Sequence, residues 1–96
     1  MVRKLQKADI DRVADIWLDT NLKAHDFISA QYWKRNFELV KEMLLQAEVY
    51  VYESDQKIQG FIGLNNDYIE GIFVSDKMQS QGIGKILLND IKDKKN

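Results

Sequence analysis

A hexapeptide containing two glycines has the residue types of a phosphate-binding loop. It reads Gln79-Ser80-Gln81-Gly82-Ile83-Gly84, and the apolar residues after it have helical spacing. Glycines at a helix start let a ligand approach the backbone, and the free amides of the first turn point outward at the positive end of the helix dipole. The hexapeptide therefore indicates an anion site; the alternative is a loop that merely needs flexible residues before a helix.

Single residues exclude two familiar kinds of phosphate-binding loop. The dinucleotide-binding fingerprint needs a third glycine three residues after Gly84, where this chain has Leu87. The nucleoside-triphosphate loop needs Ser or Thr after its lysine, but Ile86 follows Lys85. The hexapeptide therefore belongs to neither class.

Composition limits what other chemistry the chain can do. Its 14 Lys and Arg against 15 Asp and Glu give a net charge of -1, so the broad positive charge of a nucleic-acid binder is missing. There is no cysteine to act as thiol nucleophile or metal ligand, and His25 alone does not make a zinc site. We therefore expect no metal, no nucleic acid and no membrane span, and a cytoplasmic protein.

Length and hydrophobic periodicity predict one small α+β domain over residues 1–96. With 45% hydrophobic and 30% charged residues, the chain has a globular composition. Turn residues over 54–56 and over Asn65-Asn66-Asp67 separate three strands into an antiparallel meander. The expected elements are a strand over 2–5, a helix over 9–20, a helix from the N-cap Ser29 to 46, strands over 48–53, 57–64 and 68–74, and a last helix opened by Gly82.

This order of elements, with Gln79, Gly82 and Gly84 before the last helix, resembles the GNAT superfamily of acetyl-CoA-dependent N-acetyltransferases. The hallmark of that family is Gln/Arg-x-x-Gly-x-Gly/Ala between the fourth strand and the third helix. Other segments resemble the YiaC-type bacterial branch, whose members acetylate amines on proteins or peptides. These segments are Ile16-Trp17, His25-Asp26-Phe27-Ile28, Tyr32-Trp33 and Gly60-Phe61-Ile62-Gly63.

The resemblance implies a GNAT (acyl-CoA N-acyltransferase) fold fragment in the order β-α-α-β-β-β-α. The sheet is expected to be mixed and mostly antiparallel, with three helices around it. All 96 residues resemble about the first two-thirds of the family domain, so the C-terminal third, with a fifth strand and a fourth helix, is expected to be missing.

The resemblance also implies how acetyl-CoA binds. The backbone of Ile72, Phe73 and Val74 would pair with the acetyl carbonyl and the pantetheine amides as an added strand does. The pyrophosphate would lie on the backbone amides of Gln79, Ser80, Gln81, Gly82, Ile83, Gly84 and Lys85. The Lys85 ammonium would add positive charge nearby.

Acetyl transfer needs a base for the attacking amine, and the resemblance implies Glu70. Glu70 lies two residues before Ile72, where the family commonly places a carboxylate, and Tyr68 on the same strand face is expected to position water. The alternative for Glu70 is a solvent-facing carboxylate on an edge strand. By resemblance, His25 borders the acceptor pocket with Phe27 and Tyr32 as substrate contacts; the alternative for His25 is a helix cap.

The resulting expectation is an acetyltransferase that moves an acetyl group from acetyl-CoA to a primary amine by direct attack. The acceptor would be a protein N-terminus, a lysine or a small amine. The alternative is a catalytically inactive CoA-binding remnant or an interaction module. The exposed fourth strand is also expected to support a homodimer, because an unpaired strand edge is a template for another chain.

Overall fold

Alternating apolar residues form a four-stranded sheet in the computed structural model, which describes residues 1–66 and 68–94. The strands are β1 (Val2–Lys4), β2 (Glu48–Ser54), β3 (Lys57–Asn65) and β4 (Tyr68–Val74), and they lie side by side in this order. All three pairings are antiparallel, where we expected a mixed sheet. Short turns join β2 to β3 and β3 to β4, and such connections permit only antiparallel pairs.

A two-residue turn joins β2 to β3, as the turn residues predict. Asp55 and Gln56 both have positive φ, 53° and 63°, while Ser54 pairs with Lys57. This backbone matches the right-handed twist of the two strands. At the next turn Asn66 also has a positive φ of 57°, and Asp67 lies outside the described residues.

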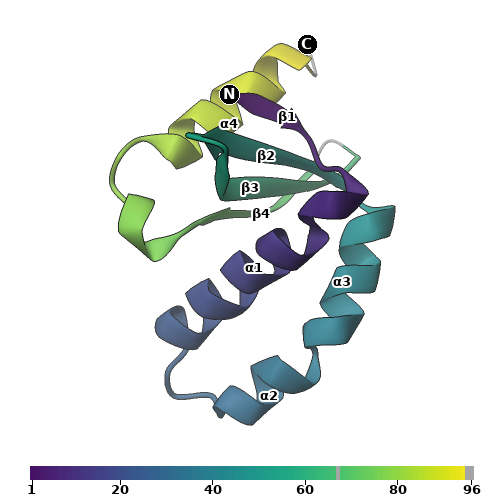
Figure 1. The fold of residues 1–96 in the computed structure, drawn as a ribbon, viewed down its shortest axis with the longest axis vertical. Coiled ribbons are helices and arrows are strands. Elements are labelled where there is room, and N and C mark those ends of the chain that lie inside the picture. Colours follow the sequence, from purple (N-terminus) through teal and green to yellow (C-terminus); the bar gives the residue numbers. More distant parts are fainter. Residues whose placement is uncertain (67, 95–96) are drawn as a thin grey trace.

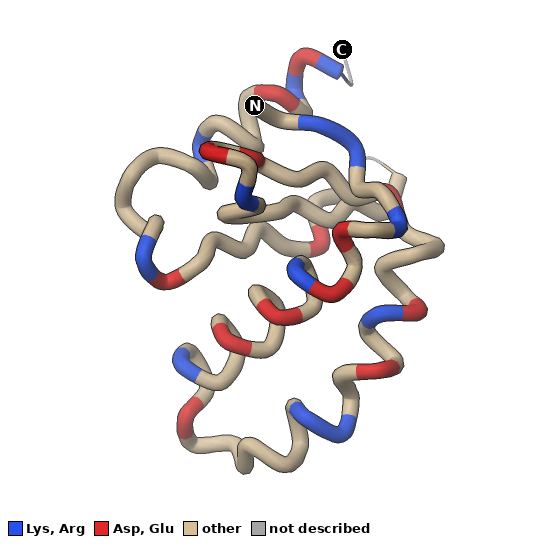
Figure 2. Tube along the Cα trace, viewed as in Figure 1, with Lys and Arg blue, Asp and Glu red and all other residues tan. Residues whose placement is uncertain are grey.

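Helices cover both faces of the sheet (Figure 1). The helices are α1 (Ile10–Ala24), α2 (Ala30–Arg35), α3 (Phe37–Gln46) and α4 (Ile83–Lys94), with 3-10 turns η1 (Lys7–Asp9) and η2 (Asp76–Met78). Acidic and basic residues are interspersed along α1 and α3 (Figure 2). Among the described residues, no helix is long and apolar enough to cross a membrane.

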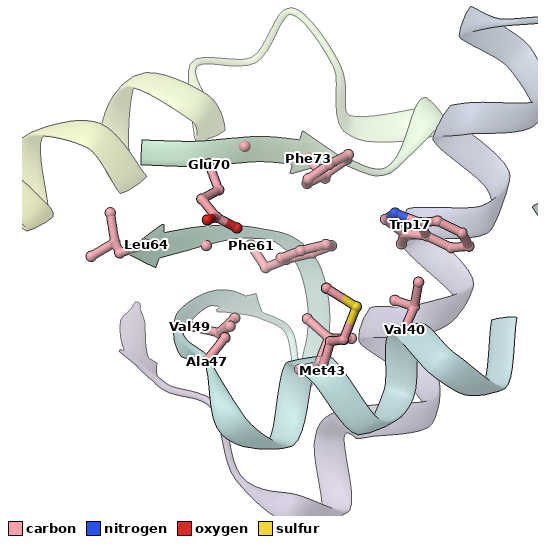
Figure 3. A pocket seen from close by; sticks show the side chains of 12 residues that line it. Trp17, Val40, Met43, Ala47, Val49, Phe61, Leu64, Glu70 and Phe73 are labelled. Carbon is pink, nitrogen blue, oxygen red and sulfur yellow. The ribbon is translucent and has the colours of Figure 1, made fainter. Parts of the chain in front are cut away.

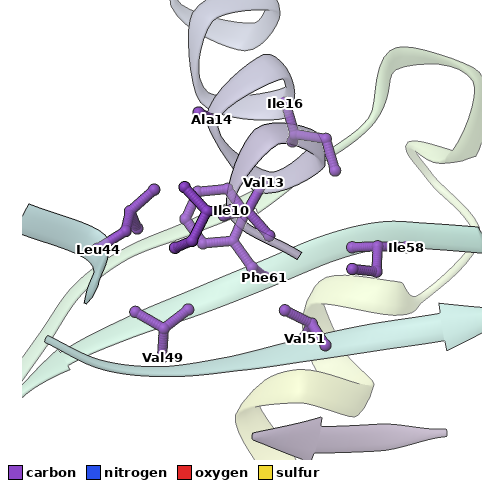
Figure 4. Packing of buried hydrophobic residues seen from close by; sticks show 9 residues of the cluster. All are labelled: Ile10, Val13, Ala14, Ile16, Leu44, Val49, Val51, Ile58 and Phe61. Atoms are coloured by element: carbon purple, nitrogen blue, oxygen red, sulfur yellow. The ribbon is translucent and has the colours of Figure 1, made fainter. Parts of the chain in front are cut away.

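The two faces of the sheet carry two separate hydrophobic clusters. The cluster under α1 and α3 is shown in Figure 4 and consists of Ile10, Val13, Ala14, Ile16, Leu44, Val49, Val51, Ile58 and Phe61. The cluster under α4 consists of Ile62, Leu64, Ile83, Leu87 and Ile91. Neighbours such as Phe61 and Ile62 enter opposite clusters because successive strand side chains point to opposite faces. This alternation fixes the register of β3.

The helices depart from the predicted boundaries in two places. Residues 21–24 continue α1, although we expected the helix to end at Thr20. The helix expected from Ser29 to residue 46 is divided at Asn36, whose amide bonds to Trp33 O and whose side-chain Nδ2 donates to Tyr32 O at 2.8 Å. Asparagine competes for backbone carbonyls in this way, so the sequence there favours an interruption.

An ion-pair network connects β1 to β2 and to the start of α1. Arg3 contacts Asp9 at 2.7 Å and Glu53 at 2.7 Å, and the Asp9 carboxylate also accepts from the Gln6 amide at 2.8 Å. The hydrogen bonds from Arg3 lower the pKa of Asp9. The ionised carboxylate therefore stabilises the fold above the pKa of the unfolded chain, and this stability is lost as the pH falls through the lower folded value.

Replacing Asp9 by Asn should lower the free energy of unfolding by about 1–2 kcal/mol at neutral pH. The wild type should lose this increment below about pH 4, near the ordinary carboxyl pKa, whereas Asp9→Asn should lack that part of the acid dependence. Urea unfolding at a series of pH values measures both effects. Parallel stability curves for the two proteins would show that the network contributes nothing.

Candidate functional site

A β-bulge determines where Glu70 lies. Gly63 pairs with Gly71 and Leu64 pairs with Ile69, so Glu70 is an extra residue of β4 with no residue opposite it. A bulge of this kind changes the side-chain alternation by one residue. As a result, Glu70 and Gly71 both line the cavity on the side of the sheet that α1 and α3 cover.

This cavity has a volume of about 260 Å³, and Glu70 extends from β4 into it (Figure 3). Glu70 is the one charged residue among its described lining residues, and the others are apolar or glycine. The lining residues are Trp17, Val40, Met43, Leu44, Ala47, Val49, Phe61, Gly63, Leu64, Glu70, Gly71 and Phe73. Among the described residues, Glu70 forms no ion pair, so its carboxylate remains available to a ligand.

Phe73 forms one wall of the cavity and depends on Gly71. The Phe73 ring stacks on Phe61 with centroids 4.8 Å apart and an interplanar angle of 16°. A Cβ atom at Gly71 would be 2.6 Å from the Phe73 ring, so only glycine lets the ring lie there. Gly71 therefore positions Phe73, whose ring lies over it.

The outer edge of β4 offers backbone groups to a ligand. The Ser75 amide bonds to Gln59 O at 2.9 Å, and bonded and non-bonded pairs alternate along an antiparallel ladder. Phe73 therefore directs its backbone groups toward β3, while Ile72 and Val74 direct theirs outward. We expected this edge to pair with pantetheine through three residues. It offers both backbone groups of Ile72 and the amide of Val74, whose carbonyl accepts a hydrogen bond from the Gln79 side chain.

The loop between β4 and α4 has the backbone of an anion-binding turn. Ser80 and Gly82 have φ values of 66° and 83°, a left-handed conformation that favours glycine. The Gln79 side chain donates to Val74 O at 3.2 Å and so folds the loop back onto the strand end. Successive residues that alternate in this way direct their amides into one concave surface.

Helix α4 presents its first amides beside this edge. Its first hydrogen bond joins Ile86 N to Gly82 O at 3.0 Å, so the amides of Ile83, Gly84 and Lys85 precede the helical bonds. A Cβ at Gly82 would have no heavy atom within 4 Å, which leaves space for an anion. A Cβ at Gly84 would be 3.6 Å from the Ile72 side chain, so the helix start adjoins the strand edge.

A second cavity of about 250 Å³ adjoins the same edge. Its lining residues are Thr20, Asn21, Ala24, His25, Ile72, Phe73, Val74 and Gln79. Phe73 lines both cavities and therefore separates the strand edge from the Glu70 cavity. The structure thus brings His25, Gln79 and residues 72–74 together.

Other predicted site residues lie farther out. Tyr68 and Phe27 are 80% and 79% exposed, Tyr32 is 52% exposed, and the described residues that line the two cavities include none of them. His25 forms the C-cap of α1, and its ring stacks on Trp33 at 5.5 Å with Phe27 edge-on at 5.9 Å. Lys85 is exposed at the helix start.

The sequence did not identify Met43, Gly63 or Gly71 as cavity residues. Glycine inside an apolar strand often marks a bulge or a close approach, so Gly63 and Gly71 carried a readable signal. Met43 has helical spacing, and only tertiary packing shows that it borders a cavity. Within the described residues, no three His, Cys, Asp or Glu side chains gather as a metal site would need.

Comparison with known proteins shows the family. Residues 14–96 match the family described as Acetyltransferase (GNAT) domain. The peptidyl-lysine N-acetyltransferase YiaC of Escherichia coli (strain K12) is 30% identical over 96 residues, which are 98% of this chain and 66% of that protein. The peptidyl-lysine N-acetyltransferase YjaB of Salmonella typhimurium (strain LT2) is 30% identical over 91% of this chain and 61% of its own length. The chain thus spans less than two-thirds of these relatives.

Solved structures show the same fold. The solution structure of apo-form YjaB from Escherichia coli matches with a TM-score of 0.84 and 22% identity over 98% of this chain and 65% of that one. The crystal structure of PaiA N-acetyltransferase from Thermoplasma acidophilum in complex with coenzyme A matches with a TM-score of 0.82 and 15% identity. That match covers 99% of this chain and 70% of the other. The α+β class and the order β-α-α-β-β-β-α are therefore confirmed, with the second predicted helix divided into α2 and α3.

Proposed function

The chain belongs to the acetyltransferase (GNAT) domain family, and from this premise we propose that it moves the acetyl group of acetyl-CoA to a primary amine by direct attack. The observation that carries this proposal is the position of Glu70. Glu70 is exposed to solvent, and its side chain lines an apolar cavity that shares the Phe73 wall with the open edge of β4. An acceptor in the Glu70 cavity and an acyl donor at the strand edge would therefore lie on either side of Phe73 and meet at its ring.

The residues at this edge fit acetyl-CoA. The outward groups of Ile72 and Val74 would bind the pantetheine amides as a neighbouring strand does. The amides of residues 82–85 would hold the pyrophosphate, because a helix start favours anions and Gly82 leaves room for one. Lys85 would add charge from the exposed side of α4. Bound acetyl-CoA supplies a thioester that an amine nitrogen can attack.

Glu70 is the base in this proposal. Its carboxylate takes the proton of the acceptor ammonium, directly or through one water, so that the nitrogen lone pair is free. The nitrogen then bonds to the acetyl carbon and gives up its second proton to solvent. The carbon–sulfur bond breaks, and the thiolate leaves with the electron pair and takes a proton from solvent. Tyr68 retains an auxiliary role at the outer end of β4, where its hydroxyl would orient water.

The acceptor proposed is the side-chain amine of a lysine in a protein or peptide. Two relatives of the chain are named peptidyl-lysine N-acetyltransferases, and a carboxylate with apolar surroundings suits an ammonium on an aliphatic stem. The test mixes the chain and acetyl-CoA with three acceptors: an N-terminally blocked lysine peptide, a lysine-free peptide with a free N-terminus, and a small alkylamine. Mass spectrometry should show acetylation of the lysine peptide. Absence of transfer to all three would contradict the proposal.

A second candidate function is CoA binding without transfer. It is favoured by the outer edge of β4 and the first amides of α4, which suit CoA whether or not an acceptor binds. Calorimetry separates the two functions, since tight CoA binding with no acetylated product would identify a binding module. The compartment proposed for either function is the cytoplasm, with which a cysteine-free sequence is compatible.

The open edge of β4 also predicts self-association. Tyr68, Ile69 and Ile72 are 80%, 43% and 37% exposed beside backbone groups that lack a strand partner among the described residues. We expect a second copy to add its β4 at this edge and form a two-fold dimer at micromolar concentration. CoA would compete for the same edge, so sedimentation equilibrium should show the dimer dissociate when CoA is added. A mass near 11.3 kDa at every concentration would refute the dimer.

A further inference from the structure

We infer that Gly63, beside the Phe73 ring that Gly71 accommodates, forms a seat for the unbranched aliphatic stem of the acceptor amine, and that this seat selects such amines over backbone N-termini. The inference rests on the proposed function. It adds a specificity determinant, Gly63, that no sequence pattern identified as part of the site.

Gly63 leaves one patch of the sheet uncovered, and the Phe73 ring lies over Gly71 beside it. Gly63 and Gly71 are directly opposite each other on β3 and β4, and both line the Glu70 cavity. A Cβ at Gly63 would have no heavy atom within 4 Å, so the space above it is empty. A cross-strand pair of larger residues would fill this space, because opposite Cβ atoms lie only about 4.5–5.5 Å apart.

The surroundings of this patch suit a chain of methylene groups. Phe61 and Phe73 form a stacked aromatic wall, and Met43 from α3 also lines the cavity (Figure 3). Methionine adapts its shape to flexible apolar ligands. The volume of about 260 Å³ lies below the roughly 300–1,000 Å³ of pockets for drug-sized ligands, so the site suits a narrow stem.

Glu70 orients the stem. It is the one charged residue among the described lining residues, so an ammonium group entering the cavity will be drawn to it. An α-amine at a protein N-terminus carries a peptide group two bonds away. That polar group would be buried between the apolar walls with few hydrogen-bond partners. An alkylamine brings no such group, so burial disfavours the N-terminus relative to the alkylamine.

Substitution of Gly63 by Val tests the seat because the added side chain has room and points into the cavity. Binding of n-butylammonium and of Gly-Gly amide is measured by amide chemical shifts in the ¹⁵N-labelled chain, with no acyl donor present. We expect the wild type to bind n-butylammonium at least about tenfold more tightly, with shifts at Gly63 and Gly71. Gly63→Val should weaken n-butylammonium binding by at least about tenfold. The control variant Lys57→Val, which places a valine on β3 outside this cavity, should bind n-butylammonium as tightly as the wild type does.

The outcomes separate this inference from the proposed function. Equal binding of the two amines by the wild type, or unchanged n-butylammonium binding by Gly63→Val, would overturn the seat even if acetyl transfer occurs. The variant Met43→Ala has the opposite effect to Gly63→Val, because it removes a lining side chain. It should enlarge the cavity and reduce the preference for n-butylammonium over a bulkier branched amine. Met43 is 59% exposed, so this variant should fold. Failure of acetyl transfer with the seat intact would count against the proposed function alone.

Discussion

Replacement of Glu70 by Gln is expected to lower kcat for acetyl transfer by about 10²–10⁴-fold while leaving the affinity for CoA unchanged. Glutamine has the same shape as glutamate but does not accept the proton of an acceptor ammonium. The effect should be confined to the chemical step, because the edge groups proposed to bind CoA belong to Ile72 and Val74 and not to the Glu70 side chain. Steady-state kinetics with a lysine peptide and calorimetry with CoA measure the two quantities.

Glu42→Gln is the matched control. Glu42 is exposed on α3 and does not line the Glu70 cavity, so the same loss of charge there should leave kcat unchanged. If Glu70→Gln keeps wild-type kcat at neutral pH, another group is the base.

Replacement of Gly82 by Val is expected to weaken CoA binding by at least about a hundredfold. Gly82 has a φ of 83°, which a β-branched residue adopts only under strain of about 1–3 kcal/mol. The valine side chain would also occupy the open space in front of the helix amides that should hold the pyrophosphate. Calorimetry measures the affinity, and circular dichroism should still show the helices because Gly82 is exposed and outside both hydrophobic clusters.

The variant Gly82→Asn separates the effect of backbone strain at residue 82 from the effect of a side chain that blocks the helix amides. Asparagine tolerates the left-handed conformation far better than valine does, yet it also adds a side chain in front of the amides. We therefore expect Gly82→Asn to weaken CoA binding relative to the wild type, but by less than Gly82→Val does. Wild-type affinity in Gly82→Val would place the pyrophosphate somewhere other than this loop.

The order of elements could be predicted because each depends on local signals. Apolar spacing located the helices, Asp55 and Gln56 marked the first hairpin, and the glycines over 82–84 marked the start of α4. The division of the second helix at Asn36 was missed. There a local side-chain bond to Tyr32 O competes with helical bonding, and helical periodicity alone does not reveal it.

The site was harder to predict because it depends on one residue of register. Counting back from Ile72 places Glu70 on the strand face of Ile72, but the bulge between β3 and β4 moves it onto the face of Phe73. That bulge arises from pairing between two strands, and Gly71 within β4 indicates a bulge without showing which residue is the extra one. The cavity is equally nonlocal, because Trp17 and Met43 come from helices far apart in sequence.

The central claim is that acetyl-CoA binds along the outer edge of β4 and onto the start of α4. Titration of CoA into the ¹⁵N-labelled chain, followed by amide chemical shifts, tests this position independently of any activity. We expect the largest chemical-shift changes at the outward-facing amides of Ile72 and Val74 and at residues 82–85. Smaller changes are expected at Phe73, whose amide bonds to β3. Shifts confined to α2 and α3, or no shifts at millimolar CoA, would contradict it.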